Sequence, residues 1–180
     1  MLYTRSEISK KYSSTYQVNK ALENNELYKI QNGIYSDKKC VNPLDVISKK
    51  YPNFIFTMDS AFYYWNLTDV VPNKFCLATK KTSIRLNHDN YQQYFVDNKI
   101  FEIGKMTLIV DNVKINIYDK ERLLVELVRK KNILPFDYYK EIISNYRKIV
   151  STLDSYKIAN YISIYKNDNT LYDRIQSEVF

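Results

Sequence analysis

The chain has 180 residues, of which 45% are hydrophobic and 26% charged, and its formal net charge is +7. This length allows one domain or two small ones, and the hydrophobic fraction is that of a globular protein rather than a disordered one. No apolar run approaches the roughly 18 residues of a membrane span, and the first residues do not resemble a signal peptide. We therefore expect a cytoplasmic protein with no membrane contact.

Composition also excludes several chemistries. The only glycines are Gly33 and Gly104, so a Gly-rich phosphate-binding loop is excluded. The single histidine, His88, lies in a polar stretch where a solvated loop residue is expected. The two cysteines, Cys40 and Cys76, form neither a disulfide framework nor a metal-ligand spacing. The sequence thus predicts no metal, no cofactor and no catalytic residue.

The first 25 residues predict two short, capped helices. Thr4-Arg5-Ser6-Glu7 fits a capping box and predicts a helix to about residue 12. Ser14-Thr15-Tyr16-Gln17 fits a second capping box, and apolar residues at helical spacing follow it to about residue 25. Two short helices joined by a tight turn are typical of a helix-turn-helix.

A tight hairpin is predicted directly after these helices. Residues 27–31 and 34–36 flank Asn32-Gly33, which is the strongest short-range signal for a two-residue type I′ turn. Helix, turn, helix and hairpin in this order are typical of a winged helix. Only three residues precede the first capping box, so we expect a winged helix over residues 1–42 that lacks its usual first helix.

Residues on and beside the second helix have the chemistry of DNA contacts. In a winged helix this helix enters the major groove, where carboxamides pair with adenine and aromatic side chains contact thymine methyls or phosphates. The residues predicted to read the operator are Tyr16, Gln17, Asn19 and Lys20. The predicted phosphate contacts are the helix N-terminus at Ser14 and the side chains of Lys10, Lys11, Lys20, Lys29, Lys38 and Lys39.

The basic excess of the chain is concentrated at this end. Residues 1–50 hold 9 basic and 5 acidic side chains, whereas residues 136–180 hold equal numbers of the two. We therefore expect double-stranded DNA as the partner, with salt-sensitive binding that depends on dimerisation or adjacent sites. The alternatives for this module are protein contact or inert packing.

Residues 43–180 predict a mixed α/β domain that ends in a helical, bundle-like segment. The expected strands cover about 54–57, 74–79, 100–104, 106–110 and 113–118. The expected helices cover about 44–50, 58–65, 119–130, 137–150, 154–165 and 169–179. The chain as a whole is therefore predicted to be α+β, with an N-terminal winged helix-turn-helix.

The helix that follows Asp119 is expected to be amphipathic. Its leucines and valines should face inward, with Arg122, Glu126, Arg129 and Lys130 outward. Pairs four residues apart, 122 with 126 and 126 with 130, should support one another. Asp119 is explained as the helix cap and Glu121 as a first-turn acid favoured by the helix dipole.

Three segments occur in an order that is typical of one family. Leu27–Tyr35 is similar to that family's wing, Asp59–Asp69 with Pro72 to its Ser-Ala-aromatic…Leu-Thr-Asp…Pro segment, and Ile117–Leu124 to its Tyr-Asp-x-Glu-Arg-Thr-Leu segment. Leu123 stands where the family often has Thr. Over roughly residues 4–165 the chain thus resembles the AbiEi-type antitoxins of bacterial abortive-infection, type IV toxin–antitoxin systems.

The resemblance implies two activities. The winged helix would repress the antitoxin–toxin operon by binding inverted repeats in its promoter, as a dimer where the operator requires it. The C-terminal domain, 43–180, would antagonise a nucleotidyltransferase-like toxin without needing a stable complex. The motif residues expected to organise that domain, through folding rather than direct chemistry, are Asp59, Ser60, Asp69, Asp119, Glu121 and Arg122.

We therefore predict a non-enzymatic antitoxin and transcriptional autorepressor that takes part in phage defence. One alternative is a protein-binding neutraliser that contacts its toxin directly and has no DNA role. A second is an enzyme that is a weak nuclease or modifies the toxin. Asp111 and Glu121 faintly resemble a nuclease carboxylate pattern, but the lysine of that pattern is absent.

Overall fold

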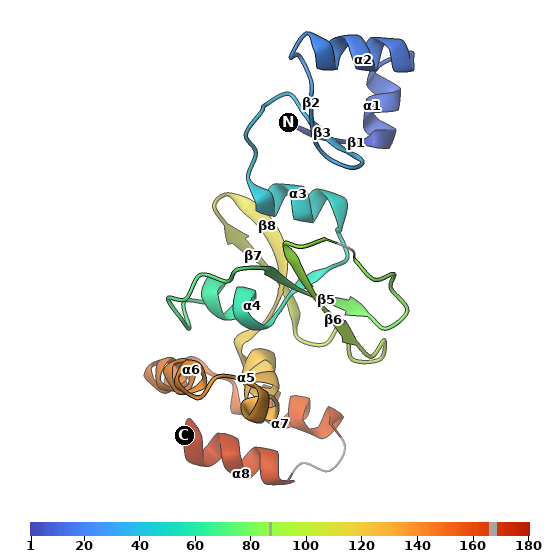
Figure 1. Ribbon diagram of the computed structural model, residues 1–180. Helices are drawn as coiled ribbons and strands as arrows, with labels where there is room; N and C mark the ends of the chain where they lie inside the picture. Colours follow the sequence, from blue (N-terminus) through green and yellow to red (C-terminus); the bar gives the residue numbers. More distant parts are fainter. Residues whose placement is uncertain (87, 166–168) are drawn as a thin grey trace. The chain divides into compact units, whose positions relative to one another are not determined.

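The computed structural model describes residues 1–86, 88–165 and 169–180 (Figure 1). Over these ranges the chain is α+β, with eight α-helices and two β-sheets, as the sequence predicted for the fold class. It divides into an N-terminal unit, residues 1–54 with 109–115, and a C-terminal unit, residues 55–108 with 116–180. None of the helices in the described ranges combines the length and the apolar character of a membrane span.

The N-terminal unit begins with a three-stranded antiparallel sheet and two helices. In chain order these elements are β1 (Leu2–Thr4), α1 (Arg5–Lys11), α2 (Thr15–Glu23), β2 (Tyr28–Gln31) and β3 (Ile34–Ser36). The strand order is β1-β3-β2, so β1, which the sequence did not predict, extends the expected hairpin. Ile8, Ala21 and Leu27 form the buried core of this part.

The starts of both helices follow the predicted capping signals. The Thr4 Oγ1 atom accepts from the Glu7 N–H at 3.3 Å, and the Glu7 carboxylate accepts from the Thr4 N–H at 2.7 Å. The Ser14 Oγ atom likewise accepts from the Gln17 N–H at 3.3 Å. The Gln17 side chain, however, accepts from the Ser13 N–H at 2.9 Å, so it fixes the turn between the helices rather than completing a capping box.

The predicted hairpin turn and linking helix are also present. Gln31 pairs with Ile34 across the two-residue turn. The turn is not the expected type I′, which requires a positive φ at both central residues, because Gly33 has a φ of 81° whereas the φ of Asn32 is not positive. Helix α3 (Pro43–Lys50) begins where the Asn42 Oδ1 atom accepts from the Leu44 N–H at 2.9 Å. A capping Asn followed by Pro at the first helical position therefore explains where α3 starts.

A five-stranded mixed sheet follows in the order β6-β5-β4-β8-β7. Its strands, with the helix between the first two, are β4 (Ile55–Phe56), α4 (Met58–Tyr64), β5 (Phe75–Lys80), β6 (Tyr91–Val96), β7 (Lys105–Val110) and β8 (Val113–Tyr118). Strand β4 is antiparallel to β5 and parallel to β8, and β5 is parallel to β6. Alternation in β8 is as expected, with Val113, Ile115 and Ile117 buried and Lys114 exposed.

Two strand predictions in this region were wrong. Strand β6 was missed, because its mixed polar and aromatic sequence becomes a strand through parallel pairing with the buried β5. Residues 100–104 were expected to form a strand but form turns, with the Ile100 N–H donating to the Asp97 carbonyl and the Ile103 N–H to the Ile100 carbonyl. The turns are held in the core by Phe101, which is only 1% exposed, and this burial explains why the stretch is apolar.

The C-terminal unit ends in helices that surround α5. These elements are α5 (Lys120–Arg129), η1 (Lys131–Ile133), α6 (Phe136–Lys148), η2 (Val150–Thr152), α7 (Ser155–Ile164) and α8 (Asn169–Glu178). Helix α5 packs against α4, α7 and α8, and its leucines and valines are fully buried (Figure 1). It is therefore the central helix of this unit.

Candidate nucleic-acid interface

Helix α2 presents a polar face to solvent. Tyr16, Gln17, Asn19 and Lys20 are all exposed, and Tyr16 is 74% exposed. On the opposite side Ala21 is buried in the small core between the helices and the hairpin. The amphipathic pattern of α2 thus leaves the four residues expected to read DNA accessible, which is the geometry that groove contact requires.

The two carboxamides on this face are not equivalent. Bidentate pairing with adenine uses both the oxygen and the NH₂ group of an Asn or Gln side chain. The Gln17 oxygen already accepts a hydrogen bond from the Ser13 backbone. Within the described residues the Asn19 side chain has no hydrogen-bond partner, so Asn19 has the free carboxamide, and Gln17 also positions the helix.

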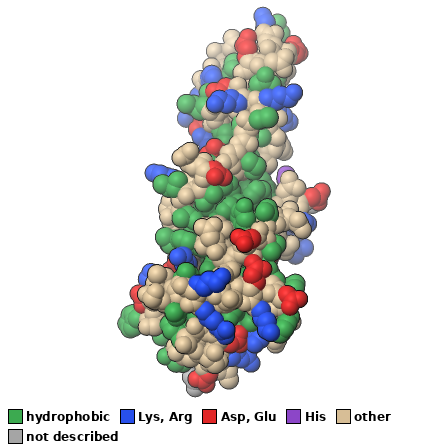
Figure 2. Space-filling view, turned by 90° about the vertical axis from the view of Figure 1, so that its left-hand side faces the viewer, with side chains coloured by type: hydrophobic (Ala, Val, Ile, Leu, Met, Phe, Trp, Pro, Cys, Tyr) green, Lys and Arg blue, Asp and Glu red, His purple; other side chains and the backbone are tan. Residues whose placement is uncertain are grey.

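The expected phosphate contacts are exposed lysines. In the described part of the chain none of Lys10, Lys20, Lys29, Lys38 and Lys39 pairs with a carboxylate, and all are exposed. Figure 2 shows, at the top of the view, basic side chains on the visible face of this unit. These charges are therefore free to meet a polyanion.

Two carboxylates of the unit are held by other cations. Lys49 lies 2.7 Å from Glu7, and hydrogen bonds from Lys49 and from the Thr4 backbone lower the pKa of Glu7 to about 2. Asp37 binds the chain's own amino terminus, which lowers its pKa. Lys11 differs from the other lysines, since its ammonium lies 3.2 Å from the Tyr3 hydroxyl and over that ring.

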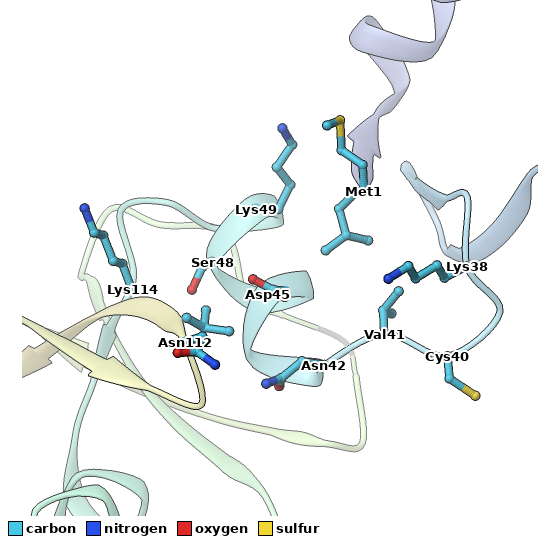
Figure 3. Close-up of a pocket in the computed structure, with 12 residues that line it drawn as sticks. Met1, Lys38, Cys40, Val41, Asn42, Asp45, Ser48, Lys49, Asn112 and Lys114 are labelled. Carbon is cyan, nitrogen blue, oxygen red and sulfur yellow. The ribbon is translucent and has the colours of Figure 1, made fainter.

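A pocket of about 650 Å³ lies in the same unit, lined by β1, the segment after β3, α3 and residues 112–114 (Figure 3). Lys38, Lys49 and Lys114 contribute positive charge to its lining, and Asp45 contributes negative charge. In Figure 3, the side chains of Lys49 on α3 and Lys114 on β8 both point upward in the view. The exposed Cys40 thiol has no hydrogen-bonded base among the described residues, so the pocket lacks a nucleophile–base pair.

The antitoxin-motif residues lie in the C-terminal unit, and Asp119 caps α5 as predicted. Its Oδ1 atom accepts from the Arg122 N–H at 2.8 Å, and its Oδ2 atom accepts from the Tyr161 hydroxyl at 2.7 Å. Burial raises the pKa of Asp119, although these two hydrogen bonds oppose the shift. The carboxylate thus ties the start of α5 to α7.

Arg122 does not face outward, so that prediction was wrong. Its side chain is 0% exposed, and its guanidinium lies 5.3 Å from the centre of the Tyr118 ring and 5.2 Å from that of Tyr165. It pairs with Glu126 at 3.1 Å, as the spacing predicted. The second pair of Glu126 is with Arg129 at 3.3 Å rather than with Lys130. Aromatic rings and a shared carboxylate therefore compensate in part for burying this cation, whose Nε and Nη1 atoms have no hydrogen-bond partner among the described residues.

Asp59 and Ser60 belong to a different contact, where α4 meets β5 and α6. The Ser60 Oγ atom accepts from the Cys76 N–H at 2.8 Å, and Ser60 is completely buried. The Asp59 carboxylate accepts from the Tyr138 hydroxyl at 3.2 Å. Both residues thus hold α4 against its neighbours.

Glu121 and Asp69 complete the motif set. The Glu121 carboxylate accepts from the Asp154 N–H at 3.1 Å, which fixes the start of α7. Asp69 is exposed, and it is the neighbouring Thr68 that is buried and donates to Glu141 at 2.7 Å. Among the described residues the motif does not converge on one catalytic centre, and its members contact separate parts of the C-terminal unit.

The described residues also contain no group of three or more His, Cys, Asp or Glu side chains that could hold a metal ion. Comparison of the chain with protein-family models gives no match, and comparison with curated proteins gives none either.

Proposed function

We propose that this protein is an antitoxin and transcriptional autorepressor of a type IV toxin–antitoxin operon. Residues 1–42, which lie within its N-terminal unit, would form a winged helix that binds inverted repeats in the operon's promoter. The observation that carries the proposal is the exposed polar face of α2, which belongs to a strand-supported helix pair. Lys10 and Lys20 of this pair are exposed and make no ion pair among the described residues.

The strand order of the N-terminal unit supports the winged-helix assignment. A strand that precedes two helices and pairs with the second strand of the following hairpin is the arrangement of a winged helix. Strand β1 does this, with Thr4 opposite Ile34. Because an isolated hairpin is marginally stable, this third strand and the core beneath the helices help the module to hold its shape.

The proposed docking places the N-terminal end of α2 in the major groove. Asn19 would pair with a base edge, Tyr16 would contact a thymine methyl or phosphate, and Lys20 would contact a base or phosphate. Lys29 on the hairpin, with Lys38 and Lys39 beyond it, would hold the flanking backbone.

The antitoxin half of the proposal rests on the resemblance to the AbiEi-type antitoxins. Its partner would be a nucleotidyltransferase-like toxin, antagonised by residues 43–180. The motif residues Asp119, Glu121 and Arg122 fasten α5 to its neighbours. Their role in antagonism would therefore be to maintain the fold that acts on the toxin.

The proposal is tested by a gel shift of the full chain on the promoter of its own operon. We expect Lys20→Glu to weaken binding by about tenfold or more, which corresponds to the loss of one or two charged contacts. Lys99→Glu is the matched control, because Lys99 is an exposed lysine of the C-terminal unit and the charge change is the same. The slope of log K against log salt concentration should be smaller in magnitude by about one for Lys20→Glu than for the unmodified chain, and it should be unchanged for Lys99→Glu.

A promoter that stays unshifted at low salt would overturn the repressor function. If the protein then co-eluted with the product of the neighbouring gene, the direct neutraliser would replace it. A shift weakened equally by Lys20→Glu and Lys99→Glu would contradict the assignment of α2 as the reading helix.

A further inference from the structure

A cavity of about 360 Å³ lies in the C-terminal unit, between β6, the start of α4 and the end of α5. It is unrelated to the proposed DNA contacts, which are all in the N-terminal unit. Its lining combines cationic groups with aromatic rings, among them Lys81, Arg129, Lys130, Tyr94, Tyr118 and Tyr165. Its volume lies in the range of small-molecule sites.

The carboxylates in the lining already have cationic partners. Glu126 binds Arg122 at 3.1 Å through one oxygen and Arg129 at 3.3 Å through the other. Asp97 lies 3.4 Å from the Lys81 ammonium. Both carboxylates of the lining therefore have a cationic partner. Asp59, which acts on Lys130 from outside the lining, accepts from the Tyr138 hydroxyl and makes no ion pair among the described residues.

Lys130 is the cation without a carboxylate. Its ammonium lies 4.4 Å from the centre of the Tyr94 ring, and it makes no ion pair within the described residues. Burial lowers the pKa of Lys130, because a desolvated ammonium is costly. An anion in the cavity would supply the partner that the protein does not provide.

Arg122 adds a second incompletely satisfied cation beside the wall. Its Nε and Nη1 atoms are buried and have no hydrogen-bond partner among the described residues. Three of the residues that its guanidinium contacts, Tyr118, Tyr165 and Glu126, line the cavity. Arg122 thus lies directly behind this part of the lining, and Glu126, shared between Arg122 and Arg129, neutralises only one of the two guanidinium charges.

We propose that this cavity binds a mononucleotide, with its phosphate beside Lys130 and Arg129 and its base against the tyrosine rings. The cavity is larger than inorganic phosphate requires, and a purely apolar ligand would leave Lys130 unpaired. In the unliganded chain Lys130 lies 4.4 Å from the centre of the Tyr94 ring and Arg129 lies 3.7 Å from that of Tyr165. The base would stack on these rings in place of the two cations, which would turn to the phosphate, and a planar guanidinium matches phosphate oxygens. A ligand with both a flat ring and a phosphate uses both parts of the lining.

The test is isothermal titration calorimetry of the full chain with AMP, adenosine and inorganic phosphate as probes. AMP should bind at least about tenfold more tightly than either fragment, because each fragment makes only part of the contacts. Lys130→Met should weaken AMP binding by about tenfold or more, since it removes one charged contact but keeps the apolar stem. Arg129→Gln, on the exposed end of α5, is the second variant, and it should weaken AMP binding similarly.

Lys140→Met is the matched control. Lys140 also lies over a ring, 4.3 Å from the centre of Phe136, but it is exposed and does not line the cavity. The Lys140→Met variant should bind AMP as the unmodified chain does. The Lys20→Glu variant should also bind AMP normally, so a failure of promoter binding can be told apart from a failure of AMP binding. Absence of heat with AMP, or unchanged affinity in both cavity variants, would overturn the proposal. Equal affinity for phosphate and AMP would overturn the role of the rings.

Discussion

Gly104 provides the sharpest test of the packing at the start of α5. Its φ is +74°, and a Cβ atom placed there would lie 2.8 Å from the Arg122 Cβ and 3.2 Å from the Asp119 Oδ1. Neither neighbour can retreat easily, because one is the first carbon of a fully buried side chain and the other is the helix cap. The left-handed backbone costs an L-residue about 1–2 kcal/mol, and overpacking costs about 1–3 kcal/mol. We expect Gly104→Ala to lower the free energy of unfolding by about 2–5 kcal/mol.

Gly33→Ala is the control for this substitution. Gly33 has a similar φ of +81°, but nothing lies within 4 Å of a Cβ atom placed there, so only the backbone cost of about 1–2 kcal/mol applies. Urea unfolding should be followed by circular dichroism for both variants and by fluorescence for Gly104→Ala. The single tryptophan, Trp65, donates to the Tyr118 carbonyl at 2.9 Å and therefore reports on the C-terminal unit. Equal losses in the two variants would refute the close-contact reasoning.

Two further predictions concern pH and thiol reactivity. The raised pKa of Asp119 means that the folded state keeps a proton that the unfolded chain has released, so the contribution of this group to stability falls as pH rises through the raised value. Urea midpoints between about pH 3 and 6 should therefore rise more steeply with pH in Asp119→Asn than in the unmodified chain, and a shallower rise would contradict this. Cys40 is exposed, whereas Cys76 is buried and has its pKa raised by burial and by Asp59. A thiol reagent should thus label Cys40 in the folded protein and Cys76 only after unfolding, and rapid labelling of both would contradict the burial of Cys76.

Features set by a few neighbouring residues could be predicted from the sequence. The capping box at Thr4, the cap at Ser14 and the turn at Asn32-Gly33 each depend on groups within three residues of one another. The same holds for Asp119, whose carboxylate caps the helix that follows it directly. Local hydrogen bonds are available to the chain before any tertiary contact forms, so the residue pattern carries them.

Features created by distant pairing could not be predicted in this way. Strand β1 exists because Leu2–Thr4 pairs with Ile34–Ser36, more than thirty residues later. Strand β6 depends in the same way on β5. Arg122 is buried because its guanidinium packs against Tyr118 and Tyr165, which belong to other elements. The helical periodicity of residues 120–129 holds no information about those two rings, so it predicts that every cation faces outward.

The two candidate sites differ in predictability for the same reason. The exposure of Asn19 and Lys20 follows from the amphipathic pattern of one helix, so the candidate DNA contacts can be read from consecutive residues. The cavity beside Lys130 draws its lining from α4, β6, β8, α5 and the residues that flank them. The spacing of residues within one segment cannot predict this lining, because the lining residues come together only in the folded chain.

The net charge of +7 is therefore used in two physically distinct ways. The lysines proposed to contact DNA are exposed and make no ion pair among the described residues, so they would act on a polyanion over a Debye length and be screened by salt. Lys130 and Arg122 are desolvated, so they act at short range, where added salt screens much less. The affinity for the promoter should consequently fall steeply with salt. The affinity for AMP should fall only weakly, with a slope of log K against log salt of about one in magnitude, as for the release of a single counterion. Parallel salt dependences would mean that both ligands meet the same exposed surface, and the assignment of two sites would then fail.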